Sequence, residues 1–285
     1  MKHLIQSRFA LSKVVMVAAI CLAFQSIQAS LLFTDGFNYS TGGLNASDVS
    51  PAGLSGNAWS SGSSHITVVS GNLTYAGLQN LGGNEVQDTW GISGGSVINT
   101  YTAQTSGSIY FSFLIDCTTA PTSTSQSSQF LAALNPGTGS PNGSSDALQI
   151  DVGPSGDGYQ IGLRTHGQNA TFAGTVLSLG TTYMVVAEYT FGPSGSAALY
   201  LNPVIGASQP TADVSLAGDG SVVSIADVGL KAQSTSAGGV YLLDNFLIGT
   251  TWADVTPQAV PEPSLLALAG VGLLGLAMRF CRACG

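Results

Sequence analysis

Positive charge is scarce in this chain, which has seven Lys and Arg residues against 15 Asp and Glu. Between residues 30 and 263 only Arg164 and Lys231 are basic, whereas all 15 acidic residues lie there, so this interval carries a net charge of −13. Nucleic-acid binding depends on many Lys and Arg side chains that neutralise phosphates. The composition therefore argues against a nucleic-acid partner and is typical of a protein kept soluble by an acidic surface.

Cysteine is also nearly absent. Three of the four Cys residues lie close to the ends of the chain, and Cys117 stands alone in the middle. No intrachain disulfide can form there, so the interior must be held together by packing. Cys117 ends an apolar segment and no basic partner stands out, which predicts a small buried side chain and not a nucleophile.

Internal repeats, amphipathic helices and well-supported catalytic motifs are missing as well. Gly91 to Gly95 matches the nucleophile pattern G-x-S-x-G, but no helix follows it and His166 is the only later histidine. Cys281 and Cys284 form a C-x-x-C pair without the second pair that a zinc site needs. We therefore predict no catalytic residue and no enzyme.

The N-terminus has the features of an export signal. Lys2, Arg8 and Lys13 precede the apolar stretch from Val14 to Phe24, and Ile27-Gln28-Ala29 follows. A charged region, an apolar region and a small-residue site in this order predict a signal peptide over residues 1–29. An uncleaved N-terminal anchor is the alternative, and either reading predicts export.

The C-terminus carries a second distinctive segment. Pro261-Glu262-Pro263 is followed by an uncharged run from Ser264 to Met278 and then by Arg279 and Arg282. A helix over this run covers roughly 22 Å, against ~30 Å for the hydrocarbon core of a bilayer. The run predicts a short single membrane helix with the two arginines on the cytoplasmic side. A buried core helix is the alternative, but the run lacks the polar stripe of such a helix.

These C-terminal residues resemble the PEP-CTERM sorting signal, through the tripeptide, the apolar run, Arg279 and Arg282. The resemblance implies a sorting signal over residues 258–285 that an exosortase, a membrane-embedded Cys protease and transpeptidase, processes near the tripeptide. It further implies the export machinery as a partner and transient anchoring in the inner membrane through the helix. A permanently tethered protein, whose tail is never processed, remains the alternative.

Residues 30–257 are predicted to form one all-β domain. Short segments with alternating apolar and polar residues recur between turns rich in Gly, Pro, Asn and Asp, a pattern typical of an antiparallel β-sandwich or barrel. Ser108 to Asp116 is the clearest, with Ile109, Phe111, Phe113 and Ile115 on one face. The other predicted strands are 148–152, 159–164, 183–189, 197–201, 221–228 and 241–248.

Leu32 to Tyr39 resembles the start of many exported PEP-CTERM passenger domains. Three later segments are similar to parts of concanavalin A-like, laminin-G-type jelly rolls: Leu179 to Tyr183, Tyr200 to Pro203 and Tyr241 to Trp252. The resemblance implies a concanavalin A-like sandwich, whose concave sheet face usually binds ligands, with glycans as the first candidates. The E-x-D-x-x-E strand of glucanases with this fold does not occur here.

The carboxylates suggest two kinds of site, a calcium site and a catalytic site. Asp151, Asp157 and Asp244 lie near Gly-rich turns and are candidate ligands of calcium, the one cofactor that the sequence leaves open. Glu188 lies in the middle of an apolar strand, and a raised pKa could make it catalytic. An outward-facing, solvated Glu188 is the simpler reading.

Taken together, the sequence predicts an exported, non-enzymatic component of the cell envelope or extracellular matrix that has a structural role or binds polysaccharide. The alternative is a secreted carbohydrate-active enzyme on the same fold.

Overall fold

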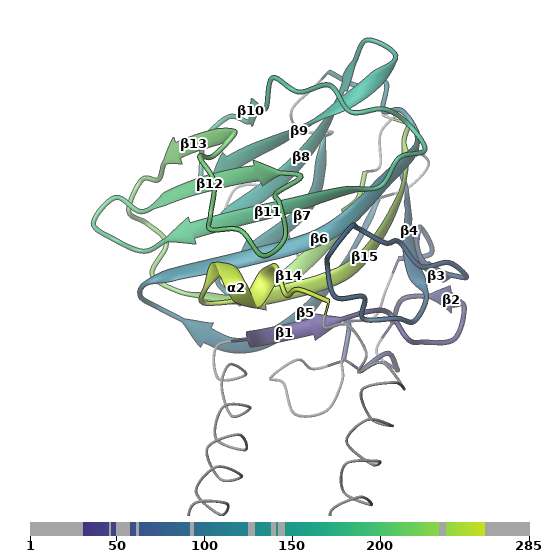
Figure 1. Cartoon of the computed structure of the whole chain (residues 1–285), viewed down its shortest axis with the longest axis horizontal. Helices are drawn as coiled ribbons and strands as arrows, with labels where there is room; N and C mark the ends of the chain where they lie inside the picture. The colour runs from purple at the N-terminus through teal and green to yellow at the C-terminus, as the bar shows by residue number, and fades with distance from the viewer. Residues whose placement is uncertain are drawn as a thin grey trace, which may run out of the picture.

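The computed structural model describes residues 31–45, 47–49, 58–60, 63–91, 94–124, 129–137, 141, 146–233 and 238–259. Nearly all regular structure in these residues is β-strand, and the strands pair antiparallel in two sheets that pack face to face (Figure 1). The predicted antiparallel β-sandwich is therefore confirmed. The predicted signal peptide, residues 1–29, and the apolar run, residues 264–278, lie outside the described residues.

The larger sheet has nine strands in the order β13-β12-β11-β6-β15-β4-β3-β2, and β1 pairs with β15 beside this path. Its strands are β1 (Leu31–Asp35), β2 (Gly42–Gly43), β3 (Ile66–Val69), β4 (Glu85–Thr89), β6 (Ser108–Thr119), β11 (Tyr183–Thr190), β12 (Ser196–Leu201), β13 (Val214–Ala217) and β15 (Val240–Gly249).

The smaller sheet has six strands in the order β10-β9-β8-β7-β14-β5. They are β5 (Gly95–Gln104), β7 (Phe130–Asn135), β8 (Leu148–Ser155), β9 (Gly158–Thr165), β10 (Thr171–Phe172) and β14 (Ile225–Ala232). One helical turn, α2 (Trp252–Val255), follows β15 directly.

The main core lies between the sheets and is built by alternation along the strands. Ile109, Phe111, Phe113 and Ile115 of β6 all belong to it and are at most 1% exposed, as the sequence predicts. Fully burying one such side chain contributes about 1.5–3 kcal/mol. Cys117 is buried in the same core, and burial raises the pKa of its thiol to about 12, so it is an unreactive core residue.

A second apolar cluster covers the outer face of the nine-stranded sheet. Leu114 of β6 and Val186 of β11 point away from the main core and pack with Leu78 and with Val255 of α2. The Ser112 hydroxyl donates a hydrogen bond to the Val255 carbonyl at 2.7 Å, which fixes α2 to β6. In Figure 1, α2 lies against this face of the sheet.

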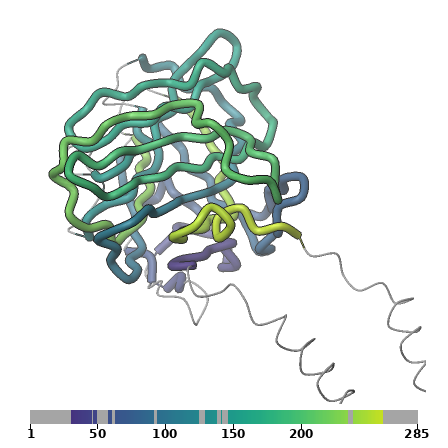
Figure 2. The backbone as a smooth tube through the Cα atoms, turned by 60° about the vertical axis from the view of Figure 1, so that its left-hand side comes forward, coloured from purple at the N-terminus to yellow at the C-terminus, as the bar shows by residue number. Residues whose placement is uncertain are grey.

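The two ends of the described chain lie together. β1 pairs with β15, the last strand, and Leu78 forms an antiparallel bridge with Gln258. Figures 1 and 2 show the purple start and the yellow end at the same end of the sandwich.

Candidate functional site

The outer face of the nine-stranded sheet carries Glu188 in the middle of β11. Its neighbours Ala187 and Tyr189 belong to the main core, so the pleat of the strand turns Glu188 outward. Across the sheet it lies opposite Ala198 of β12 and Tyr110 of β6. Glu188 is half-buried, so the outward-facing side chain that the sequence predicts is only partly exposed to solvent.

Hydroxyl and amide groups of the surrounding side chains donate hydrogen bonds to the Glu188 carboxylate. Oε2 accepts one from the Tyr200 hydroxyl at 2.9 Å and one from Gln209 Nε2 at 2.8 Å. Oε1 accepts one from the Thr190 hydroxyl at 3.0 Å. Gln209 Oε1 in turn accepts a hydrogen bond from the Tyr110 hydroxyl at 3.2 Å. The carboxylate is therefore held in one orientation by the donors around it.

The pKa of Glu188 is lowered in the folded protein. Burial raises this pKa, but hydrogen bonds from hydroxyl groups, with that of Tyr200 the largest contribution, outweigh burial. The same environment raises the pKa of Tyr110 to about 12, chiefly through burial. The expectation that Glu188 has a raised pKa, as a catalytic acid would, is therefore wrong. With a lowered pKa the carboxylate is ionised near neutral pH, so it accepts hydrogen bonds and has no proton to donate.

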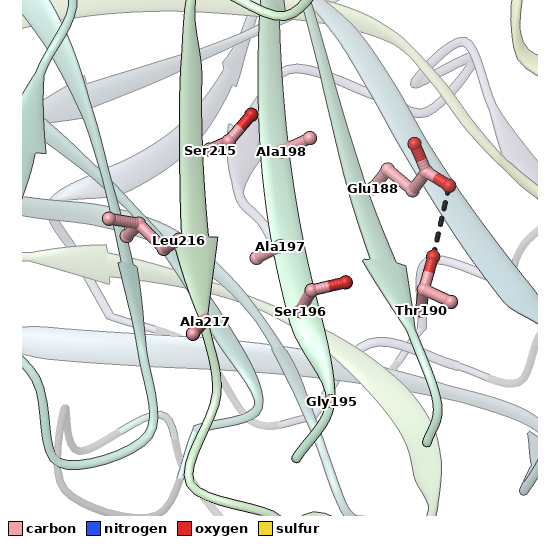
Figure 3. Close-up of a pocket in the computed structure, with 9 residues that line it drawn as sticks. All are labelled: Glu188, Thr190, Gly195, Ser196, Ala197, Ala198, Ser215, Leu216 and Ala217. Atoms are coloured by element: carbon pink, nitrogen blue, oxygen red, sulfur yellow. Dashed lines mark hydrogen bonds between the residues drawn. The ribbon is translucent and has the colours of Figure 1, made fainter. Parts of the chain in front are cut away.

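A shallow hollow of about 390 Å³ lies beside Glu188 on the same face (Figure 3). Its floor is made of small side chains from β12 and β13. In the register of these two strands Ala198 lies opposite Ser215, and Ser196 lies opposite Ala217. Glu188 and Thr190 form the wall on the β11 side, joined by their hydrogen bond. The hollow thus combines a flat, small-residue floor with hydroxyl groups and one fixed negative charge.

Aromatic rings lie next to the carboxylate on the same face. The indole of Trp252, in α2, packs edge-on against the ring of Tyr200 at 5.1 Å and the ring of Tyr110 at 6.3 Å. Its Nε1 is buried and has no hydrogen-bond partner among the described residues. Tyr110, Tyr200, Gln209 and Trp252 were not predicted from the sequence, since no motif links them and they meet Glu188 through sheet register and loop packing.

The three predicted calcium ligands do not come together. Asp151 is buried on β8 in the six-stranded sheet, Asp157 is exposed in the turn between β8 and β9, and Asp244 is buried on β15 in the other sheet. Within the described residues, no group of three or more His, Cys, Asp or Glu could hold a metal ion. Calcium binding at any of these positions remains a prediction.

Two of these carboxylates already accept hydrogen bonds from the protein. The Asp244 oxygens accept the backbone N–H groups of Leu73 and Asn245 at 3.0 and 2.6 Å, which ties the connection after β3 to β15. Asp151 accepts two hydrogen bonds from Arg164, at 2.9 and 2.8 Å, so it is one half of a buried ion pair. Neither the pairing nor the partner was predicted from the sequence.

A polar face lies on the outside of the six-stranded sheet around that ion pair. Ile150 and Leu163 point into the core, so Gln149, Asp151 and Arg164 face the other way. Gln149 is 1% exposed, and its side-chain oxygen Oε1 has no hydrogen-bond partner among the described residues. Gln149 and Asp151 are buried, so this polar face is not accessible to a ligand, whereas the hollow at Glu188 is open to solvent and is the candidate site.

A Ser, a His and an Asp also meet on the surface. His166 Nδ1 lies 2.7 Å from Asp219 Oδ2 and 2.9 Å from the Ser221 hydroxyl. Both partners therefore share one ring nitrogen, whereas a catalytic triad requires the Ser and the Asp on opposite nitrogens. The arrangement joins two loops and is not a nucleophilic site.

The predicted sorting residues Pro261, Glu262, Pro263, Arg279 and Arg282 lie outside the described residues. In the part of the chain that is described, no helix is long and apolar enough to cross a membrane.

Solved structures of several kinds are similar to this chain at low sequence identity. A mutant of the alginate lyase Aly36B in complex with an alginate tetrasaccharide is 13% identical with a TM-score of 0.44, covering 78% of this chain and 97% of the other. An endo-β-1,4-glucuronan lyase from the fungus Trichoderma reesei gives the same identity and TM-score, with coverages of 78% and 100%. The lectin UEA-II in complex with galactose is 12% identical with a TM-score of 0.38, covering 60% and 89%.

These values carry no argument about what this chain binds, and no curated protein matches it. The C-terminal region is different, because residues 259–283 match a protein-family model directly. This model describes the PEP-CTERM protein-sorting motif, the same signal that the tripeptide, the apolar run and the terminal arginines resemble. The chain therefore carries a PEP-CTERM protein-sorting motif at its C-terminus, which implies export, sorting to the cell envelope and processing by an exosortase.

Proposed function

We propose that this protein is a non-enzymatic component of the cell surface or extracellular matrix whose sandwich binds a neutral glycan in the hollow beside Glu188. The sorting motif would hold the chain transiently in the inner membrane before release. The observation that carries the proposal is the fixed Glu188 carboxylate, which lines an open hollow together with hydroxyl groups of Thr190, Ser196 and Ser215.

The chemistry of the hollow suits a polyhydroxyl ligand. The side chains around Glu188 fix its carboxylate at the edge of the hollow, where it offers a negatively charged acceptor to hydroxyl groups of a ligand. Ser196 and Ser215 on the floor can both donate and accept. Trp252 does not line the hollow, but its partly exposed ring packs against Tyr200 beside the carboxylate and adds an apolar surface there.

The charge of the site favours neutral glycans over uronates. Glu188 is negative, and the two cations between residues 30 and 263 are engaged elsewhere: Arg164 pairs with Asp151, and Lys231 donates to the Pro141 carbonyl at 3.4 Å. A polyuronate bound here would bring further carboxylates towards Glu188 without a cation to compensate them.

A non-enzymatic role is supported by the state of Glu188. Glycoside hydrolysis requires two carboxyl groups, one of which is protonated and acts as a general acid. The lowered pKa of Glu188 is unsuited to the acid, and the groups that shift this pKa include no second carboxylate. Release of product from any polysaccharide by the exported protein, and its loss in Glu188→Gln, would favour the alternative of a carbohydrate-active enzyme.

Replacing Glu188 by Gln is expected to weaken glycan binding about tenfold or more. The change removes the charge of the acceptor, and hydrogen bonds to charged groups are about twice as strong as neutral ones. Binding of the exported protein to an array of neutral and uronate glycans measures the effect. Asp157→Asn, a charge loss in the exposed β8–β9 turn, is the matched control and should bind as the wild type does. If Glu188→Gln bound glycans as tightly as Asp157→Asn does, the hollow would be ruled out as the glycan-binding site.

Removing divalent cations is expected to leave glycan binding unchanged. Every group that orients Glu188 belongs to the protein, and the buried Asp151 and Asp244 carboxylates already accept protein hydrogen bonds. Titration of the glycan selected by the array, with and without EDTA, tests this. A loss that calcium restores in the wild type but not in Asp244→Asn would instead identify a calcium-dependent site.

A further inference from the structure

The last described residues form an arm that is fastened to the sandwich. The backbone N–H of Gln79 donates to the Pro257 carbonyl at 2.8 Å, and the backbone N–H of Ala259 donates to the Gly77 carbonyl at 2.9 Å. Between these two bonds Leu78 and Gln258 form an antiparallel bridge. Leu78 is 6% exposed and belongs to the apolar cluster that also contains Val255. Residues 256–259, called the arm below, are therefore part of the folded domain.

The arm runs directly into the sorting motif. The match to the motif begins at residue 259, whose N–H is bonded to Gly77, and only Val260 separates Ala259 from Pro261. One residue of extended chain spans at most about 3.6 Å, so Pro261 lies within roughly 7 Å of the Ala259 position. The folded domain thus reaches the edge of the segment that a processing enzyme has to take.

The main-chain groups of the arm cannot serve two partners at once. Enzymes and binding proteins that take extended peptides do so largely through main-chain hydrogen bonds along the strand. In the arm, the Pro257 carbonyl and the Ala259 N–H are already bonded to the segment Gly77–Gln79. A cleft that admits the tripeptide together with the residues before it would collide with this segment.

We propose that the segment Gly77–Gln79 and the processing exosortase compete for the arm, so that the arm must detach from the sandwich before the sorting motif is processed. This rests on the sorting role proposed above and adds a regulatory step to it. The arm is a suitable element for such local opening, because two backbone hydrogen bonds, which together form the single Leu78–Gln258 bridge, join it to the segment Gly77–Gln79. Processing then depends on the folded domain as well as on the motif.

A reversible cross-link tests the competition in the full-length chain. Residues facing each other in an antiparallel bridge have Cα atoms about 4.5–5.5 Å apart, within the range for a disulfide. The double variant Leu78→Cys with Gln258→Cys, exported in a host that contains an exosortase, should be processed at least tenfold more slowly than the same chain under reductant. The two single variants control for each substitution and for pairing with Cys281 or Cys284. Equal rates for the cross-linked and reduced chains would overturn the proposal.

Lengthening the arm gives the opposite, independent test. Six Gly and Ser residues inserted between Ala259 and Val260 should speed processing severalfold, because the motif then reaches the enzyme without release of the arm. Gln79→Pro, which removes the N–H that binds Pro257, should act in the same direction, with Gln79→Ala as the matched control. No acceleration by the insertion would also overturn the proposal. A wild-type chain that is never processed would instead contradict the sorting role itself.

Discussion

Raising the pH from about 4.5 to 8 is expected to lower the free energy of unfolding of the sandwich by several kcal/mol. Burial raises the pKa of Asp88 to about 8, of Asp244 to about 7 and of Asp227 to about 6. The unfolded chain returns each of these groups to the ordinary carboxyl range near 4. Asp88, on β4, contributes most, because it faces the main core and its Oδ1 has no partner among the described residues.

The sign follows from proton binding in the two states. Below about pH 4 the three carboxyls are protonated whether the chain is folded or not, so their contribution to stability is complete there. Between the unfolded and folded pKa values the native state binds more protons, and stability falls with pH at about 1.4 kcal/mol per pH unit for each such group. Glu188 has a lowered pKa and the opposite sign, but its contribution changes only below its ordinary pKa, outside the window.

Urea denaturation between pH 4.5 and 8, with EDTA present, measures how steeply the free energy of unfolding falls with pH, which is called the slope below. Asp88→Asn keeps the shape of the side chain and cannot ionise, so this variant should lose much of the slope and exceed the stability of the wild type at pH 8. Asp157→Asn, in the exposed turn, removes one charge and should keep the wild-type slope. A wild-type stability that is constant or rises over this window would show that the buried carboxyls are not protonated in the native state.

Six of the strands could be predicted from the sequence, and others, including β5 and β7, could not. The predicted segments fall within β6, β8, β9, β11, β12 and β15, and each of these strands has residues of the main core on one face. In β7, Phe130 to Leu134 is apolar at every position, so no alternation of residue type marks this segment as a strand, and none was predicted there. The segment predicted over residues 221–228 is displaced, since β14 begins only at Ile225.

The site was predictable only as a single residue. Glu188 could be noticed because it interrupts an apolar strand, but Tyr200, Gln209 and Trp252 are 12 to 64 positions away and meet it through sheet register and loop packing. The pairing of Asp151 with Arg164 could have been inferred, because the Gly156-Asp157 turn closes a tight hairpin. That hairpin places Gln149 opposite Arg164 and Asp151 two residues along. Register between strands that are distant in sequence leaves no such local signal.

Replacing Arg164 by Met is expected to destabilise the sandwich by about 3–5 kcal/mol at neutral pH, the usual cost of removing one partner of a buried ion pair. The side chains of Asp151 and Arg164 are 0% and 11% exposed, and the guanidinium donates to both carboxylate oxygens. Burial raises the pKa of Asp151, and Arg164 opposes this shift. Without Arg164 the carboxyl is left in a low-dielectric site, where the Gln149 amide donates a hydrogen bond to it at 2.7 Å.

Lys231→Met is the matched control, since it removes the other positive charge between residues 30 and 263. Its ammonium group donates to one carbonyl at 3.4 Å and neutralises no partner in that bond, so we expect a loss below about 1 kcal/mol. The double variant Arg164→Met with Asp151→Leu should recover most of the stability, because a buried pair replaced by apolar groups is often neutral. The penalty of Arg164→Met should also shrink towards pH 4, where Asp151 can take up a proton. If Arg164→Met and Lys231→Met unfolded at the same urea concentration at pH 7, the Asp151–Arg164 ion pair would not have the predicted weight in the stability of the sandwich.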